Sequence, residues 1–97
     1  MKVKKIKPFY IYGVKYPVRV TNLLAPIIGT CDRDKKQIYI ESCIESEDLF
    51  LKTLLHEVCH GLVYESGLSN VISQEVEELI CIAMEKYVDL FDIKIKK

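Results

Sequence analysis

The first 41 residues arrange apolar and polar positions in short alternating runs, which is typical of β-strands. Segment 8–20 is rich in aromatic and β-branched residues around Gly13, a turn residue, and therefore predicts a β-hairpin. Because Pro17 has no backbone N–H to donate, the second strand lies at a sheet edge or breaks there. Segments 27–31 and 37–41 flank a charged turn and predict a second hairpin.

The rest of the chain changes to helical spacing. Ser46, followed by two acidic residues, is a helix N-cap signature, and apolar residues then recur at helical intervals until Gly67, the expected stop. Ser73 begins a second predicted helix that runs to about Phe91. Its predicted core stripe consists of Val76, Leu79, Ile80, Ala83, Tyr87 and Leu90. The pattern predicts one α+β domain over residues 1–97: a small antiparallel sheet of about four strands followed by two packed helices.

Composition and charge exclude several classes of protein. The 97 residues suffice for one small domain with a modest core. Lys plus Arg equals Asp plus Glu at 14 each, so we expect neither nucleic acid nor a membrane surface as a partner. No apolar run has the length of a signal-peptide core or a membrane span. Four cysteines without a C-x-x-C pair are expected to be buried free thiols in a cytoplasmic protein: Cys31, Cys43, Cys59 and Cys81.

Both histidines of the chain lie in the first predicted helix, in the segment H-E-V-C-H at residues 56–60. Residues four apart share one helix face, so His56 and His60 can reach the same metal ion, with Glu57 near a metal-bound water. This H-E-x-x-H pattern predicts two zinc ligands and a general base. The alternative is an amphipathic helix with two partly exposed histidines and a solvated glutamate. The apolar residues around the segment favour a metal, since a desolvated polar cluster needs partners.

A catalytic zinc ion usually has three protein ligands, and the chain has no third histidine. The acidic residues Glu75, Glu77 and Glu78 open the second helix, which the short connection packs antiparallel to the first, so they lie near His60. Glu78, the deepest of the three in the helix, is the preferred third ligand. Glu75 lies one turn earlier on nearly the same face and is the alternative, whereas Glu77 points away from both. All three also fit as first-turn acids that interact favourably with the helix dipole.

The H-E-x-x-H segment and the start of the second helix together resemble the gluzincin metallopeptidases. The resemblance is to the ImmA/IrrE-like family and to the very small zincin-like proteins of bacteriophages and prophages, and covers roughly residues 27–90. In that family the third ligand is the Glu that opens an E-A-N-x-F-A segment. Here Glu78 and Ala83 match its first and last positions, whereas Leu and Ile replace the Ala and Asn.

The resemblance and the residues imply a zinc-dependent metallopeptidase with a minimal zincin-like fold. His56, His60 and Glu78 would hold Zn²⁺, and Glu57 would act as the general base toward a zinc-activated water. A peptide or protein substrate would bind along the predicted edge strand 37–41 by strand addition. We expect such a hydrolase in the cytoplasm of a bacterial or phage-infected cell.

Two other classes of function remain alternatives. The first is a zinc-stabilised protein-binding module that has the zincin fold and no turnover, although a purely structural zinc site needs no base such as Glu57. The second is a metal-free helical scaffold. A peptidase also benefits from an extra hydrogen-bond donor to the developing oxyanion, but Tyr39 and Tyr64 are interpreted as packing residues.

Overall fold

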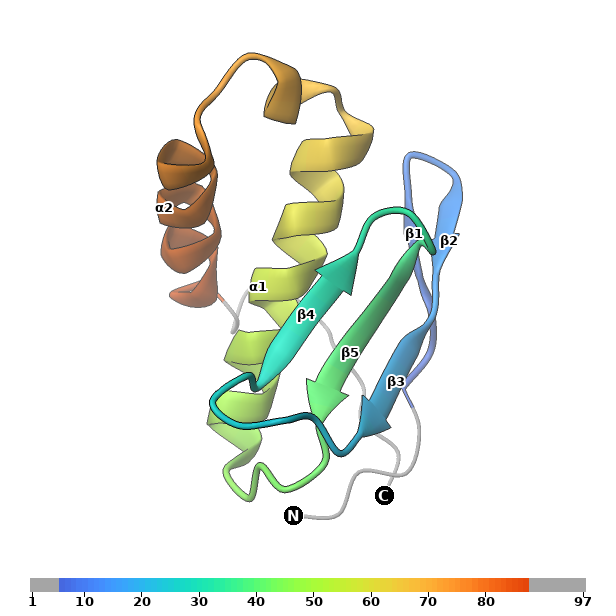
Figure 1. Cartoon of the computed structure of the whole chain (residues 1–97), viewed down its shortest axis with the longest axis vertical. Helices are drawn as coiled ribbons and strands as arrows, with labels where there is room; N and C mark the ends of the chain where they lie inside the picture. The colour runs from blue at the N-terminus through green and yellow to red at the C-terminus, as the bar shows by residue number, and fades with distance from the viewer. Residues whose placement is uncertain (1–5, 88–97) are drawn as a thin grey trace.

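The computed structural model describes residues 6–87, in which five strands precede the helices (Figure 1). The α+β architecture predicted from the sequence is confirmed. The strands are β1 (Phe9–Ile11), β2 (Val14–Tyr16), β3 (Val18–Thr21), β4 (Gly29–Asp32) and β5 (Gln37–Glu41). The helices are α1 (Glu47–Glu65), the short 3₁₀ helix η1 (Leu68–Asn70) and α2 (Gln74–Glu85).

The first predicted hairpin forms, but the chain changes its partner at Pro17. Strands β1 and β2 pair antiparallel as a separate two-stranded sheet. Pro17 cannot donate a hydrogen bond to β1, and its carbonyl instead accepts one from the Ile38 N–H at 2.9 Å. The residues that follow form β3, which runs parallel to β5. The predicted break at Pro17 is confirmed and divides the second strand in two. The prediction of a single antiparallel sheet is wrong in sheet number and in the direction of this pair.

The second sheet has the order β3-β5-β4, so segment 37–41 is its central strand. The prediction that this segment is an edge strand is wrong, because β3 covers its other side. The edge strand beside α1 is β4, which pairs antiparallel with β5. The Glu41 N–H donates to the Ile28 carbonyl at 2.9 Å. In an antiparallel pair, the backbone N–H and C=O groups of every second residue point to the partner strand. Because the Ile28 carbonyl points to β5, the backbone groups of Gly29 and Cys31 point to the open edge of β4.

Helix α1 has the predicted ends and packs its apolar side on the sheet. The Ser46 hydroxyl accepts from the Leu49 N–H at 3.2 Å, and Gly67 takes the left-handed conformation (φ +82°) that ends the helix. Although α1 has 19 residues, no helix in residues 6–87 is long and apolar enough to cross a membrane. The core between the helix and the strands consists of Ile6, Ile11, Tyr16, Ile38, Ile40, Ile44, Phe50 and Leu54.

Helix α2 runs back beside α1, but it is shorter than predicted (Figure 1). The Ser73 hydroxyl accepts from the Val76 N–H at 3.1 Å, which confirms the predicted cap. The helix ends at Glu85, and a turn follows it, so the predicted end near Phe91 is wrong. Residues 88–91 of that prediction lie outside the described part of the chain.

The orientation of α2 also differs from the prediction. Of its predicted core stripe, Leu79 is 65% exposed and Val76 44% exposed, whereas Glu77 and Cys81 are buried. Moving each position by one residue corresponds to a rotation of about 100° about the helix axis. The helix therefore turns Glu77 and Cys81 toward α1, and leaves Leu79 and Val76 of its predicted apolar stripe at the surface.

Candidate metal centre

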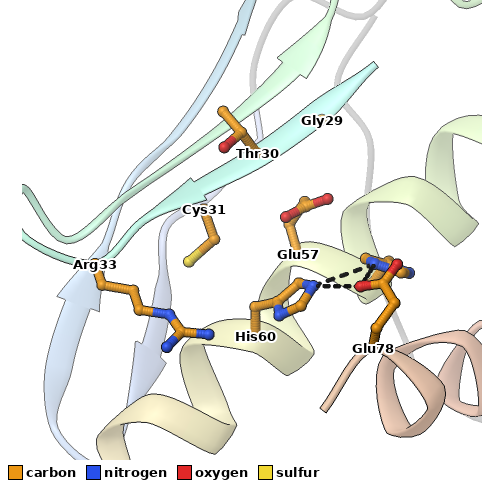
Figure 2. A pocket seen from close by; sticks show the side chains of 8 residues that line it. Gly29, Thr30, Cys31, Arg33, Glu57, His60 and Glu78 are labelled. Atoms are coloured by element: carbon orange, nitrogen blue, oxygen red, sulfur yellow. Dashed lines mark hydrogen bonds and ion pairs between the residues drawn. The ribbon is translucent and has the colours of Figure 1, made fainter. Parts of the chain in front are cut away.

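The side chains of His56, His60 and Glu78 meet between α1 and α2. Figure 2 shows Glu78 reaching toward His60. The two histidine Nε2 atoms are 3.3 Å apart. Glu78 Oε1 lies 3.1 Å from the Nε2 of His56 and 3.0 Å from that of His60. Among the residues that the structure describes, this is the one group of three or more His, Cys, Asp or Glu side chains arranged to hold a metal ion.

The second nitrogen of each histidine contacts a carboxylate. His56 Nδ1 lies 2.6 Å from a Glu85 oxygen, and His60 Nδ1 lies 2.6 Å from a Glu77 oxygen. Such carboxylates typically fix the tautomer and the ring orientation of metal-bound histidines. With the protons on Nδ1, the two Nε2 lone pairs and the Glu78 oxygen face one another. Three acceptors at this spacing need positive charge between them, either protons or a metal cation.

The spacing and the donor types fit zinc. Zinc–ligand bonds of about 2.0–2.1 Å in a tetrahedral arrangement separate neighbouring ligand atoms by roughly 3.3 Å. The three donor atoms here are 3.0–3.3 Å apart. Two imidazoles and one carboxylate form the ligand set of a catalytic zinc site, which keeps a further position for water or substrate.

The surrounding carboxylates make the site attractive to cations. Burial alone would lower the pKa of His56, but the hydrogen bond to Glu85 and the negative charge of Glu78 outweigh burial, so the pKa is raised above its usual value. Because the same carboxylates favour any cation at this point, they favour a metal ion as well.

Glu57 lies beside the group, between α1 and the edge strand β4 (Figure 2). It is 8% exposed, and burial raises the pKa of its carboxyl against the opposing charges of His56 and His60. A raised pKa suits a group that must accept a proton near neutral pH. Gly29 permits this arrangement, because a Cβ there would lie 2.7 Å from Thr53 Cγ2 and 3.2 Å from Glu57 Cγ.

A cleft of about 380 Å³ opens between β4 and the two helices. Burial and then the charge of Glu57 raise the pKa of the Cys31 thiol to about 12, so Cys31 lines the cleft as a neutral thiol. The residues around the cleft, most of them labelled in Figure 2, are Gly29, Thr30, Cys31, Arg33, His56, Glu57, His60 and Glu78.

The structure brings the preferred ligand Glu78 to the histidines, and leaves the alternative, Glu75, exposed and outside the group. Glu77 and Glu85 were not predicted to belong to the site, yet each contacts a histidine. One signal pointed to Glu85: it lies seven residues after Glu78, and two helical turns place both on one face. The sequence contains no such signal for Glu77, because the predicted orientation of the apolar stripe directs its side chain away from the histidines.

The cysteines correspond only partly to the expectation. All four are free thiols, and Cys59 and Cys81 are buried between the helices. Cys43 is exposed, and Cys31 is half-buried at the cleft. The expectation of buried thiols is therefore wrong for Cys43, which follows the last strand at the sheet margin.

In comparisons with protein-family models, curated proteins and solved structures, the chain matches none. The case for a metal centre therefore depends on the residues and their geometry. Two features of that geometry carry it: three converging donor atoms, and a carboxylate behind each imidazole.

Proposed function

We propose that the protein is a zinc-dependent metallopeptidase of the gluzincin type, similar to the ImmA/IrrE-like and small phage zincin-like proteins. His56, His60 and Glu78 would hold the zinc ion, and Glu57 would be the general base. One observation carries the proposal: the three donor atoms converge at zinc spacing beside a buried carboxylate in an open cleft.

Zinc at this position would polarise the scissile carbonyl and lower the pKa of a water molecule. Glu57 takes the proton of the attacking water and donates it to the leaving amine. Burial favours the protonated state through which Glu57 passes. Glu77 and Glu85 hold the two imidazoles so that their Nε2 atoms stay directed at one point.

The open edge of β4 is the place where the substrate would bind. Gly29 and Cys31 direct their backbone groups to that edge, next to Glu57, and an extended peptide there would add a strand to the sheet. This assignment replaces the central strand 37–41. The four free thiols fit a reducing compartment, so we place the activity in the cytoplasm of a bacterial or phage-infected cell.

A comparison of the wild type with Glu57→Gln tests the proposal. Both proteins, purified without added metal, are expected to contain about one zinc ion per chain by elemental analysis. Only the wild type should cleave members of a peptide library followed by mass spectrometry, with a loss in Glu57→Gln of about a hundredfold or more. Equal cleavage by both proteins, or a zinc-free wild type, would contradict the proposal. Zinc in both proteins without cleavage would instead support the zinc-stabilised binding module.

A further inference from the structure

Arg33 is the one lysine or arginine that lines the cleft in the described part of the chain. It follows β4 directly, and Figure 2 shows its side chain reaching from the end of that strand toward His60. Of the charged groups around the cleft, Glu57 and Glu78 have roles in the proposed reaction. Arg33 contacts Glu77 but has no role toward the substrate in that reaction, and it lies at the end of β4 where an added strand would run.

The guanidinium of Arg33 is held from two sides. It donates through Nη2 to the Glu77 carboxylate, and its central carbon lies 5.4 Å from the centre of the Tyr64 ring. The side chain remains 33% exposed. A guanidinium has five N–H donors in a rigid fork, so the contact with Glu77 leaves donors for a second carboxylate. The remaining N–H donors of Arg33 can therefore donate to an anionic group that enters the cleft.

The other end of β4 has the opposite character. There an apolar hollow of about 180 Å³ adjoins His56 and Glu57, with Ile28, Leu49 and Thr53 in its walls. Among residues 6–87, no lysine or arginine lines this hollow, and Glu85 also borders it. At about 3.3 Å per residue, the four steps from Gly29 to Arg33 span roughly 13 Å, so one extended peptide can reach both ends.

We propose that Arg33 binds a carboxylate of the substrate, and that the peptidase prefers an acidic group at the Arg33 end of β4 and an apolar residue at the Ile28 end. This inference depends on the proposed function and adds a substrate class to it. In a peptide antiparallel to β4, the acidic side chain precedes the scissile bond and the apolar one follows it. A peptide parallel to β4 would instead offer Arg33 its C-terminal carboxylate.

Three matched peptides that share one apolar residue test the inference. The first contains Asp and has an amidated C-terminus, and the second has Asn in place of that Asp. The third is the Asn peptide with a free C-terminus. The zinc-loaded wild type is expected to cleave the Asp peptide with at least tenfold higher kcat/KM than its amidated Asn partner. This preference should disappear in Arg33→Gln and persist in Arg19→Gln, which removes the same charge from an exposed position on β3. A preference for the free C-terminus would identify the terminal carboxylate as the group bound.

Equal rates for all three peptides in the wild type would overturn the inference, and this comparison requires no Arg33 variant to fold. An equal loss of the preference in Arg19→Gln would overturn it too, since only general charge would then matter. Binding of the same peptides to zinc-loaded Glu57→Gln, measured by calorimetry, separates the two proposals. If Glu57→Gln binds the Asp peptide selectively but the wild type cleaves none of the peptides, the peptidase proposal is contradicted and the binding of a carboxylate by Arg33 is supported. Neither binding nor turnover would contradict both.

Discussion

The two helices of this protein are oriented by different interactions. Helix α1 turns its apolar side to the strands, where Leu54 is 0% and Phe50 1% exposed. Helix α2 turns carboxylates toward α1 and leaves Leu79 65% exposed. In α1 the burial of apolar side chains decides the orientation. In α2 the contacts of acidic residues with histidines act together with the packing of Cys81 against Cys59 and Val63.

Both hydrophobic burial and charge pairing bear on the orientation of α2. Exposing a leucine or valine side chain forgoes about 1.5–3 kcal/mol of hydrophobic stabilisation. A buried charge without a partner costs several kcal/mol. Turned toward α1, Glu77 meets His60 and Arg33, Glu85 meets His56, and Glu78 meets both histidines. These contacts and the packing of Ile80 and Met84 on the Cys59, Val63 and Cys81 cluster together accompany the exposure of Leu79 and Val76.

The largest expected effect is on zinc affinity, in Glu78→Ala. Removing one of three protein ligands should lower the affinity by about a thousandfold, which is roughly 4 kcal/mol. Competition with a chromophoric chelator measures the change. Glu75→Ala is the matched control, because Glu75 lies one turn earlier and outside the group, and its effect should be less than threefold. A larger effect of Glu75→Ala would show that the third ligand is misassigned.

Next in size is the contrast between two leucines. Leu54→Ala on α1 should lower the free energy of unfolding by about 2–5 kcal/mol, because the side chain is completely buried. Leu79→Ala on α2 should change it by no more than about 0.5 kcal/mol. Urea titrations of both variants under the same conditions give the comparison. Equal destabilisation would mean that the apolar stripe of α2 is covered, and the account of the two helices would then be wrong.

The sequence predicts well those features that depend on local signals. The Ser46 cap and the stop at Gly67 fix α1, and the four-residue spacing puts both histidines on one of its faces. The central position of segment 37–41 depends on pairing with β3, which lies well before it in the chain and changes partner at Pro17. The sequence predicts only one partner for segment 37–41, the neighbouring segment 27–31, so the strand was predicted to lie at an edge of the sheet.

Helix α2 could not be oriented from its sequence for a related reason. Its apolar positions, Val76 and Ile80 among them, keep helical spacing, and so do its acids Glu78 and Glu85. Periodicity places each set on a face but does not say which set has partners. That depends on the histidines of another helix. Glu78 was proposed because a catalytic zinc site needs a third ligand, whereas no such requirement pointed to Glu77.

A smaller change in zinc affinity is expected when the carboxylates behind the imidazoles lose their charge. Glu77→Gln and Glu85→Gln should each lower the affinity about 10–100-fold, as is typical of such partners. Glu77→Gln should have the larger effect, because Glu77 is 5% exposed and also accepts from Arg33. The chelator competition measures both, with Glu75→Gln as the control. No change in either variant would contradict the role of these carboxylates in orienting the imidazoles.

The smallest effect concerns a polar contact that joins α1 to the strands. The Glu65 carboxylate accepts from Lys36 Nζ at 2.7 Å and from the Tyr16 hydroxyl at 2.5 Å. The hydrogen bond from Lys36 and then that from Tyr16 lower the pKa of Glu65 below its ordinary 4.5. Because the pKa of Glu65 is lower in the folded than in the unfolded protein, its ionised carboxylate stabilises the fold at pH values above the unfolded pKa. This contribution is lost as the pH falls through the folded pKa.

Glu65→Gln should therefore be slightly less stable than the wild type at pH 7, and the difference should shrink as the pH falls below about 4.5. Urea titrations at pH 7 and pH 3 measure it, and Glu75→Gln, at an exposed position, should show little change at either pH. Because solvent screens this contact, the apolar face should contribute more than Glu65 to the anchoring of α1. A loss at pH 7 as large as that in Leu54→Ala would mean that α1, like α2, is oriented by its charges.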